Sequence, residues 1–423
     1  MKKNAFTLVE LLAVIAILTI IMVISVPQLI TSLKNKKTDA LEKTKDLLIS
    51  AARNYVIDYE LKVPTSISIE TLCKNDYLEC PIKNPKDNSN LNGYVNVDDN
   101  KVYVYSDTRD YITIKDYIID LYNDESLRTS NGLKKDNTVD TNIRYYGSDP
   151  NNYVSFNNEL WRIIGVFGNN VKLVRSESLG SLSWDSSDSS INKGNGINQW
   201  GESTDVNGNT YLGANLQVYL NKMYYGGDTT VTCYDGSNNT TTTCPTNTLD
   251  RTAKLLIDKH TWSLGAIEMS IEDTISFYNA ERGTANGKTC TSGNYCNDSV
   301  IRTTKWTGYV ALPYITDWAY ASSESACETN IQTKDSSNLF VCKNNNWMQR
   351  SDWTWYLSPG VQSANANYVW TVSGNGNVAN YIMFGAMSKF AYYGSNVAPS
   401  IYLKSSVLMK GGSGTSSDPY KLA

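Results

Sequence analysis

Histidine is nearly absent from this chain of 423 residues, in which His260 stands alone. Imidazole is the most frequent general base and a frequent zinc ligand, so a single isolated histidine argues against most acid–base and zinc chemistries. No Ser–His or Cys–His couple can be built around it, and no phosphate-binding glycine loop follows a predicted strand. We therefore expect no catalytic residues, no metal site and no cofactor.

An excess of basic charge is also missing. The chain has 38 Lys and Arg against 42 Asp and Glu, a formal net charge of -4. Nucleic acid is recognised through a positive field that this balance does not supply, so we expect no nucleic-acid partner. Phenylalanine is scarce at 7, against Tyr 29 and Trp 10, and Asn, Ser, Thr and Gly are abundant in the second half. This mixture is typical of a β-rich extracellular surface.

The Cys-x-x-Cys spacing that marks many metal and redox sites does not occur. Instead the cysteines form close sequential pairs in polar, turn-rich stretches, which predicts local disulfides made outside the cytosol, with metal binding or free thiols as the alternative. The cysteine pairs are Cys73/Cys80, Cys233/Cys244, Cys290/Cys296 and Cys327/Cys342.

The Asp/Asn/Gly loops at 87–93 and 205–210 do not fit the spacing of an EF-hand, so polar turns explain them better than calcium binding.

The apolar run Phe6 to Val26 is the longest in the chain, and Glu10 is the one charge inside it. A helix needs roughly 20 such residues to span a bilayer, so the run predicts a membrane span over 6–26. A secretory signal peptide would have a shorter apolar core followed by a small residue at the cleavage site, whereas here the small residue, Ala5, precedes the core. Pro27 ends the run, and we expect a kink there.

Several features of this segment coincide: Lys2 and Lys3, a small residue before Phe6, the stretch FTLVE and the closing Pro27. Together they resemble the leader and N-terminal helix of type IV prepilins and pseudopilins. The resemblance implies that prepilin peptidase removes residues 1–5 by cutting between Ala5 and Phe6, that Phe6 is then N-methylated, and that Glu10 is needed for assembly with other pilin subunits.

A carboxylate near the centre of a lipid-embedded helix costs on the order of 3 kcal/mol, so it is retained where a partner or a function offsets it. In a filament of packed helices, the amino group of Phe6 in one subunit could pair with Glu10 of its neighbour in a medium of low dielectric constant. Glu10 would then fix the register between subunits. The alternative is a signal anchor with an incidental acid.

After the span, the helix is expected to continue in water to residue 60 and to leave a small head at 61–125, which contains the hairpin GYVNVDDNKVYVYS and a helix near 116–125. A polar linker is predicted at 126–139. The helix extension has an apolar pattern at three- and four-residue spacing, formed by Leu33, Ala40, Leu41, Leu48, Ala52, Tyr55 and Tyr59.

Residues 140–411 are predicted to form one large α+β domain, followed by a tail at 412–423. The domain opens as a β-meander, because NNYVSF, ELWRIIGVF and NVKLVRS are separated by Asn-Asn and Gly-Asn turns. The stretches KWTGYVALPYITDWAYASSESAC, SDWTWYLSPG, YVWTVSGNGNV and VAPSIYLKSS resemble a C-type-lectin-like domain of the kind found in relatives of the formylglycine-generating enzyme. An enzyme of that kind needs a reactive cysteine pair, whereas every cysteine here has a near neighbour in a short loop. The resemblance therefore implies a binding fold rather than an enzyme.

Aromatic residues crowd the last quarter of the domain among small polar residues. Such a mixture is typical of recognition loops, which favours an exposed ligand-binding face, although a buried strand pair with core aromatics accounts for it equally well. Lectin-like folds also serve as variable receptors diversified by retroelements. The predicted ligand-binding residues are Trp355, Tyr368, Trp370, Tyr381, Met383, Phe384, Phe390, Tyr392 and Tyr393.

These features predict a type IV pilin-like filament subunit, minor or specialised because of its size, that displays a large domain for an unknown protein or glycan ligand. The precursor would cross the cytoplasmic membrane once with the C-terminal domain outside, and the assembled subunit would be extracellular. A secretion-system pseudopilin and a variable receptor on a pilin anchor are the alternatives.

Overall fold

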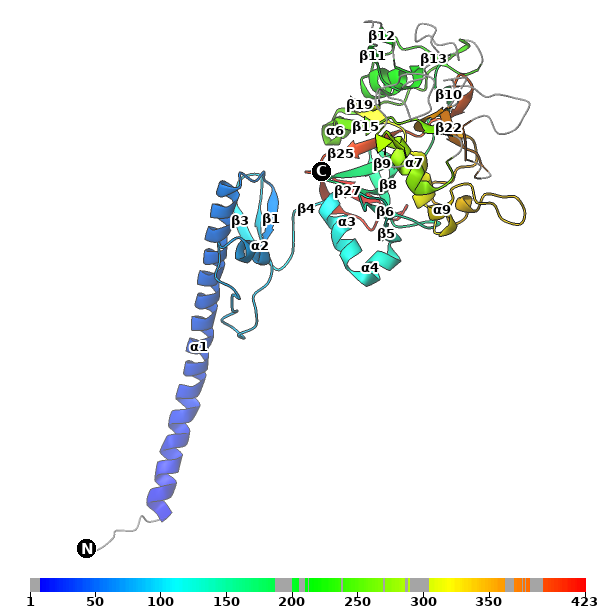
Figure 1. The fold of residues 1–423 in the computed structure, drawn as a ribbon. Helices are drawn as coiled ribbons and strands as arrows, with labels where there is room; N and C mark the ends of the chain where they lie inside the picture. Colours follow the sequence, from blue (N-terminus) through cyan, green and yellow to red (C-terminus); the bar gives the residue numbers. More distant parts are fainter. Residues whose placement is uncertain are drawn as a thin grey trace. The chain divides into compact units, whose positions relative to one another are not determined.

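The structure is a computed structural model, and its chain divides into two units, Met1–Ile112 (unit 1) and Thr113–Ala423 (unit 2) (Figure 1). Within unit 1, residues 8–112 are described. The described residues of unit 2 are 113–186, 200–204, 210–211, 213–236, 239–268, 271–285, 288–289, 304–361, 369–374, 376, 378–380 and 391–423.

Unit 1 is organised by one long helix, α1 (Leu8–Asp58), which continues through position 27 as a single element. The predicted helix is therefore confirmed over its described part. Its second half buries Leu41, Leu48 and Ala52, three residues that the spacing assigns to one face. Leu33 and Tyr59 were predicted on that face but are 57% and 52% exposed, because the buried core of unit 1 begins at Leu41 and does not extend past α1 to Tyr59.

A three-stranded antiparallel sheet covers α1 in the order β1 (Thr65–Ser68), β2 (Tyr94–Val97), β3 (Tyr103–Ser106), with α2 (Ile69–Lys74) beside it (Figure 1). Strands β2 and β3 form the predicted hairpin. Its turn is closed by Asp98, whose Oδ1 accepts hydrogen bonds from the backbone N–H groups of Asn100 (2.9 Å) and Val102 (2.8 Å). Aspartate favours such turns because its short carboxylate reaches the backbone two residues ahead.

The boundary between the units precedes the predicted linker. Helix α3 (Ile114–Asn123), which the sequence assigns to the small head, instead places Ile114, Ile118 and Leu121 in the core of unit 2. The expected linker at 126–139 contains most of α4 (Glu125–Ser130) and all of β5 (Leu133–Lys135). The polar composition of this stretch reflects the exposed side of these short elements.

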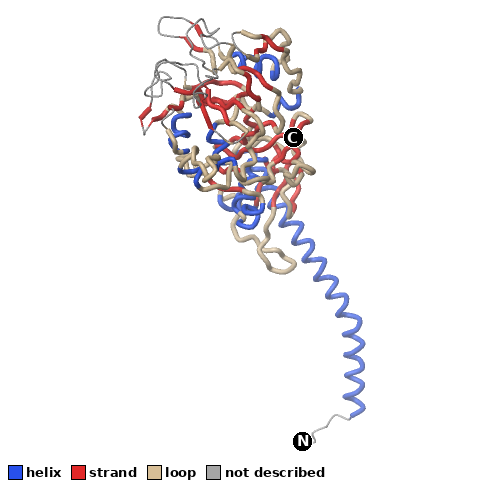
Figure 2. Tube along the Cα trace, turned by 90° about the vertical axis from the view of Figure 1, so that its right-hand side faces the viewer, coloured by secondary structure: helices blue, strands red, loops and turns tan. Residues whose placement is uncertain are grey.

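The largest sheet of unit 2 has ten strands among the described residues, in the order β20-β25-β9-β8-β7-β27-β26-β4, with β6 beside β8 and β5 beside β6. Figure 2 shows the strands of this unit in red, with short helices in blue among them. The predicted meander is confirmed as β7, β8 and β9, which pair antiparallel in sequence order. The remaining bounds are β4 (Ile112–Thr113), β6 (Ile143–Tyr145), β7 (Tyr153–Phe156), β8 (Glu159–Phe167), β9 (Asn170–Arg175), β20 (Val310–Ala311), β25 (Ser400–Leu403), β26 (Leu408–Gly411) and β27 (Tyr420–Leu422).

The sequence predicts a tail at 412–423, but this segment instead contains a strand that lies inside the large sheet. Strand β27 pairs parallel with β7 and antiparallel with β26, and Tyr420 is fully buried. The chain reverses through a turn in which the backbone N–H of Ser413 donates to Asp418 Oδ2 at 2.9 Å. Gly412 and Gly414 supply the positive φ angles (+94° and +77°) that this turn needs.

The second sheet of unit 2 follows the order β10-β24-β21-β22-β23, and β16 pairs parallel with β21. Its strands are β10 (Ser181–Ser183), β16 (Ile267–Glu268), β21 (Thr354–Val361), β22 (Val369–Val372), β23 (Val378–Asn380) and β24 (Gly394–Asn396). Short two-stranded ribbons are formed by β11 (Ser203–Thr204) with β12 (Thr210–Tyr211), β13 (Cys233–Tyr234) with β14 (Thr241–Thr242), β15 (His260–Ser263) with β19 (Lys305–Gly308), and β17 (Thr284–Ala285) with β18 (Lys288–Thr289).

Short helices pack around these sheets, which makes the unit a mixed α+β structure as predicted. Residues 215–225 and 274–281 form two of these helical stretches. The C-type-lectin-like assignment of the fold stays a prediction. Besides α3 and α4, the described helices of unit 2 are α5 (Asn215–Val218), the π-helical η1 (Tyr219–Tyr225), α6 (Arg251–Leu256), α7 (Thr274–Glu281), α8 (Ile315–Tyr320), α9 (Ala326–Thr329) and the 3-10 turn η3 (Val341–Lys343).

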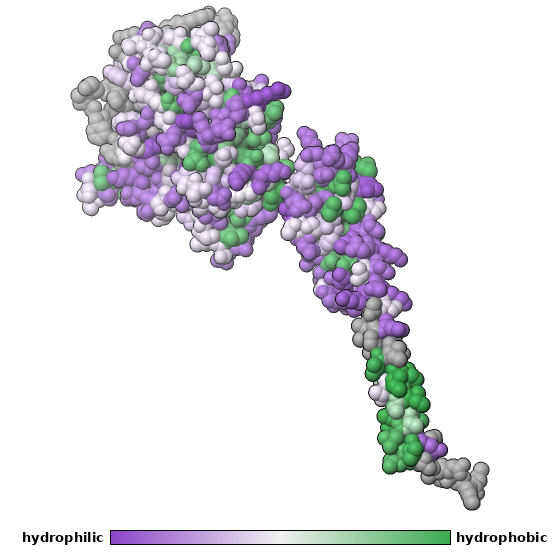
Figure 3. Space-filling model, turned by 180° about the vertical axis from the view of Figure 1, so that it is seen from behind, coloured by the Kyte–Doolittle hydropathy of each residue, from purple (hydrophilic) through white to green (hydrophobic). Residues whose placement is uncertain are grey.

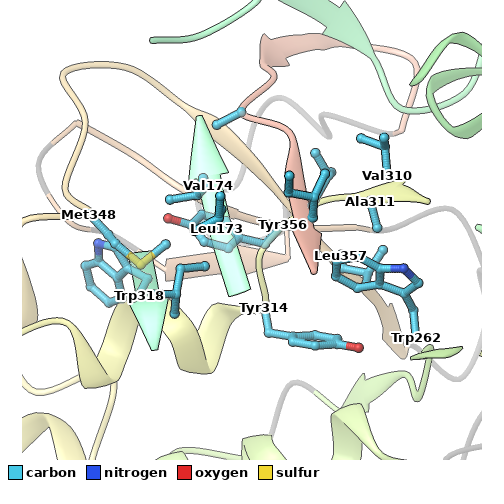
Figure 4. Close-up of a cluster of buried hydrophobic side chains, with 14 of the residues drawn as sticks. Leu173, Val174, Trp262, Val310, Ala311, Tyr314, Trp318, Met348, Tyr356 and Leu357 are labelled. Carbon is cyan, nitrogen blue, oxygen red and sulfur yellow. The ribbon is translucent and has the colours of Figure 1, made fainter. Parts of the chain in front are cut away.

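The core of unit 2 is aromatic. Figure 4 shows one part of it, where Trp262, Tyr314 and Trp318 lie around Leu173 of β9 and Leu357 of β21. Buried aromatic rings each remove a large area from water, so they dominate the packing energy of such a core. The fully buried tryptophans are Trp161, Trp184, Trp200, Trp262, Trp318, Trp355 and Trp370.

Candidate functional site

The first part of α1 presents an apolar surface. Leu8, Val9, Leu12 and Ile20 are 58% to 74% exposed, and Figure 3 shows hydrophobic residues gathered along this end of the helix. A contiguous exposed apolar surface on this scale marks a contact with a protein or a membrane. In the described part of the chain, no helix has both the length and the apolarity needed to cross a membrane. The span predicted at 6–26 therefore stays a prediction.

Glu10 lies in the first turn of α1 on this apolar surface and is exposed. An acidic side chain in the first turn interacts favourably with the positive end of the helix dipole. Ala5 and Phe6, the predicted cleavage and methylation positions, lie outside the described residues, and of Pro27 only the helical backbone is described.

Three of the four predicted disulfides are present: Cys73–Cys80 in unit 1, and Cys233–Cys244 and Cys327–Cys342 in unit 2. Cys290 and Cys296 lie outside the described residues. The pairing of near neighbours in sequence is therefore confirmed wherever the cysteines are described.

Three of the residues predicted on the aromatic binding face, Trp355, Trp370 and Tyr392, are buried instead. Trp355 and Trp370 are 0% and 2% exposed, because they lie on the paired strands β21 and β22. Their indole N–H groups donate to Leu182 O (2.8 Å) and Ile267 O (3.3 Å) respectively. Tyr392 is 9% exposed and packs beside the half-buried Tyr393; Tyr368, Tyr381, Met383, Phe384 and Phe390 lie outside the described residues.

His260 is held in a structural setting. Its ring stacks on Tyr402 with centroids 3.7 Å apart, and Nδ1 lies 3.4 Å from Asp258 Oδ2. Burial lowers the pKa of His260, and the carboxylate of Asp258 offsets only part of this effect. No group of three or more potential metal-ligating side chains occurs in the part of the chain that is described. In the loop 87–93, Asp87 accepts hydrogen bonds from its own neighbour Ser89.

A network of buried charges, which the sequence patterns did not predict, lies in the core of unit 2. Arg144 on β6 donates from Nε to Asp136 (2.6 Å) and from Nη1 to Asp317 (2.8 Å), and Lys172 Nζ lies 2.5 Å from the other oxygen of Asp317. All four side chains are at most 1% exposed. Charges buried this deeply persist only when they are paired and hydrogen-bonded, as these are.

The protonation of this network follows from its geometry. Burial alone would raise the pKa of Asp317, but the charges of Lys172 and Arg144 hold that pKa below its ordinary value. Burial lowers the pKa of Lys172 to about 8, since Asp317 compensates only part of the lost hydration. The network therefore ties β6, β9 and α8 together, and every charge in it is engaged by another, which indicates a structural role.

A cavity of about 300 Å³ lies at one end of the large sheet, where β8 and β9 pass the segment that leads into β21. Three arginines line it: Arg162 from β8, Arg175 from the end of β9, and Arg350. Val174, Met348 and Tyr356 form part of its apolar wall and belong to the core of Figure 4. A pocket of this size, with an apolar wall and a few convergent polar groups, has the character of a small-ligand site.

The sequence contains a signal for this cavity that composition and motif spacing do not reveal. Arg162 interrupts the apolar strand ELWRIIGVF, and Arg175 ends the apolar strand NVKLVR. Arginine within a buried strand is rare unless its charge is used. The contribution of Arg350, nearly 200 residues further along the chain, depends on tertiary structure that no local pattern reveals.

Comparison with known proteins identifies the N-terminus alone. Residues 1–26 match the model of the prokaryotic N-terminal methylation motif. No curated protein and no solved structure matches the chain. The motif fits the N-terminus of a type IV pilin or pseudopilin, and it implies that the chain is a substrate of prepilin peptidase, is membrane-anchored as a precursor, and assembles with other pilins into an extracellular filament.

Proposed function

We propose that this chain is a minor or specialised type IV pilin-like subunit that displays unit 2 at the cell surface as a non-enzymatic binding or adhesion domain. The observation that carries the proposal is the methylation motif on a helix with two different halves. The first half of α1 exposes apolar side chains, and the second half packs into the head of unit 1. Such a helix is suited to packing against copies of itself through its first half.

Unit 2 supports the second part of the proposal. It has its own large core and an arginine-lined cavity that the buried charge network does not use. Disulfides outside the cytosol stabilise domains that face an oxidising environment, and unit 2 contains two in its described part. A secretion-system pseudopilin and a variable receptor on a pilin anchor are the competing functions.

Imaging of cell-surface filaments with an antibody raised against residues 140–411 tests the proposal. We expect labelled filaments on cells that carry the wild-type chain. We expect Glu10→Ala to abolish labelled filaments while the membrane fraction retains the protein, because the substitution removes a lipid-phase penalty together with the partner for a neighbouring amino group.

Glu42→Ala is the matched control, since Glu42 is an exposed acid of α1 whose partner is Lys45 on the same helix. This variant should assemble normally. Mass spectrometry of the filament protein should place the mature N-terminus at Phe6. Filaments of normal number in the Glu10 variant, or an N-terminus at Met1, would contradict the proposal.

A further inference from the structure

The arginine-lined cavity of unit 2 has a property that the buried charge network lacks: one of its cations, Arg350, forms no ion pair among the described residues. Arg350 donates from Nη1 to Ser176 O (2.7 Å) and from Nη2 to Arg175 O (2.8 Å). Burial lowers the pKa of the Arg350 guanidinium from its ordinary value. A guanidinium held by carbonyl oxygens alone keeps its full charge available to an anion.

The other two arginines are anchored and still have donors to spare. Arg162 donates from Nε to Asn152 Oδ1 (2.7 Å) and from Nη2 to Asp149 (3.0 Å), while Tyr153 and Trp347 cover its guanidinium at 4.1 and 4.7 Å. Arg175 donates from Nε to Glu159 (2.7 Å) and from Nη1 to two backbone carbonyls. Within the described structure, Nη1 of Arg162, Nη2 of Arg175 and Nε of Arg350 have no hydrogen-bond partner, and none of the three is fully buried.

A further polar group accompanies these donors. The hydroxyl of Ser176, a residue that lines the cavity, is buried and has no hydrogen-bond partner among the described side chains and backbone. A buried hydroxyl without a partner is costly, so it is expected where a ligand or water completes it. The cavity thus offers guanidinium donors and an unpaired hydroxyl.

The charges of the lining also bear on how a ligand binds. Among the described lining residues, Arg162, Arg175 and Arg350 face one acid, Glu177, while Asp149 and Glu159 already neutralise part of two arginines. With three arginines against these three carboxylates the local charge balances, so an anionic ligand gains from hydrogen bonds to individual guanidinium groups rather than from a net positive field. Planar carboxylates match the fork geometry of arginine, and the apolar wall accommodates the carbon atoms attached to the carboxylate.

We infer that this cavity binds a small organic carboxylate, engaged by Arg162, Arg175 and Arg350. The inference rests on the proposed function of unit 2 as a binding domain and specifies its ligand chemistry. Two sources supply such a group, an acidic sugar and the C-terminus of a peptide, and both fit a cavity of about 300 Å³. Each has a neutral counterpart of the same shape, which allows the charge to be tested separately from the size.

The test is a calorimetric titration of the full chain, purified in detergent, with glucuronate, N-acetyl-trialanine, their neutral counterparts glucose and N-acetyl-trialanine amide, and inorganic phosphate. We expect one carboxylate to bind at least about tenfold more tightly than its neutral counterpart and than phosphate. Whichever carboxylate binds identifies the source. Failure of both carboxylates to bind below about 10 mM, or binding of the neutral compound or phosphate with equal affinity, would overturn the inference.

Variants assign the binding to this cavity. We expect Arg350→Gln to weaken the carboxylate by about tenfold or more, and Glu177→Gln to tighten it about threefold because the exposed acid at the cavity is neutralised. Arg251→Gln, which removes an exposed arginine of α6, is the matched control and should leave the affinity unchanged.

If Arg350→Gln fails to fold, the Glu177 variant remains decisive, since its side chain is exposed and its removal disrupts no core contact. An unchanged affinity in Glu177→Gln, or in a folded Arg350→Gln, would show that the carboxylate binds elsewhere and would overturn the inference. The titration needs no filament. Absence of filaments with intact carboxylate binding therefore contradicts only the assembly part of the proposed function.

Discussion

Unit 1 and unit 2 bury different kinds of residue. The described core of unit 1 consists of Leu, Ile, Val and Ala, packed between α1 and a three-stranded sheet. The core of unit 2 contains buried tryptophans and, beside them, the charges of Arg144, Lys172 and Asp317. Aliphatic cores tolerate exchange of similar residues, whereas a core built on hydrogen-bonded charges and indole N–H groups depends on particular partners.

The two units also differ in where their candidate functional groups lie. In unit 1 the candidate functional surface is exposed, because it is the apolar end of α1 that carries Glu10. In unit 2 the described aromatic residues Trp355, Trp370 and Tyr392 are buried, and three arginines line a cavity. Unit 1 is therefore suited to assembly and unit 2 to recognition of a small group, and the stability of the two units should respond to different substitutions.

The largest effect on this comparison is expected from Asp317→Ala. The substitution leaves Arg144 with one of its two carboxylates and Lys172 with none, in a site where both are at most 1% exposed. Removing one partner from a buried ion pair costs about 3–5 kcal/mol, so the unfolding transition of unit 2 should fall sharply while that of unit 1 stays in place. Differential scanning calorimetry of the full chain in detergent measures both transitions.

Glu202→Ala is the control for Asp317→Ala, because Glu202 is an exposed acid of unit 2. Its effect on the unfolding free energy should lie within about 0.5 kcal/mol. Equal effects of the two substitutions would mean that the charge network does not hold unit 2 together.

Next in size is Trp370→Ala, which tests whether the aromatic residues are core or binding face. Trp370 is 2% exposed, and its ring meets Phe277 with centroids 4.9 Å apart. Truncating a buried tryptophan costs about 3–5 kcal/mol, and we expect that loss in the unit 2 transition. Tyr393→Ala, at a half-buried position, should cost less than about 1 kcal/mol. A stable Trp370 variant that has lost ligand binding would restore the exposed-face interpretation.

The fate of these aromatic residues shows what sequence can predict. Helix α1, the hairpin β2–β3 and the meander β7–β9 were predicted because their patterns are local: an apolar repeat, an aspartate turn and strand alternation. Burial of Trp355 and Trp370 depends on partners that lie 173 and 103 residues away in the sequence, Leu182 O and Ile267 O. A mixture of aromatic and small polar residues has the same composition in a recognition loop and in a core, so composition alone does not separate them.

The C-terminal segment also combines a loop that a local pattern predicts with a strand that depends on distant residues. Gly, Ser and Asp in GGSGTSSDPY predict a loop, and the loop is there. Whether a strand follows is decided by an open edge on β7, more than 260 residues earlier, against which Tyr420 and Lys421 pair. The arginine cavity is likewise assembled from three separate segments, so its individual residues are visible in the sequence but their convergence is not.

A third, smaller effect concerns pH and is confined to unit 2. Asp185 is fully buried, and burial raises its pKa to about 7. Between about pH 4 and pH 7 the folded chain therefore binds more protons at this carboxyl than the unfolded chain does, so the unfolding free energy of unit 2 falls as the pH rises through this range. Three pKa units set a ceiling of about 4 kcal/mol.

Asp185→Asn should remove this slope and make unit 2 more stable than the wild type at pH 7.5, with little difference at pH 4. Asp228→Asn is the control: the hydroxyl and backbone N–H of Thr230 lower the pKa of Asp228, so its contribution runs in the opposite direction. Urea unfolding at pH 4 to 8 provides the measurement. A slope that survives in the Asp185 variant would place the proton elsewhere.

The smallest effect is expected in unit 1, from the double substitution Cys73→Ser with Cys80→Ser. This disulfide closes a loop of 7 residues, and loop-closure entropy predicts a loss of about 2 kcal/mol, less than the roughly 3 kcal/mol expected for the 15-residue loop of Cys327–Cys342. Unit 1 has the smaller core, so each kcal/mol lost is a larger share of its unfolding free energy than in unit 2. Each kcal/mol should therefore lower the unfolding temperature of unit 1 by more than that of unit 2. Calorimetry of this variant beside Cys327→Ser with Cys342→Ser compares the two shifts directly. A unit 1 transition that does not move, while that of unit 2 falls, would show that α1 and the three-stranded sheet hold together through their aliphatic contacts alone.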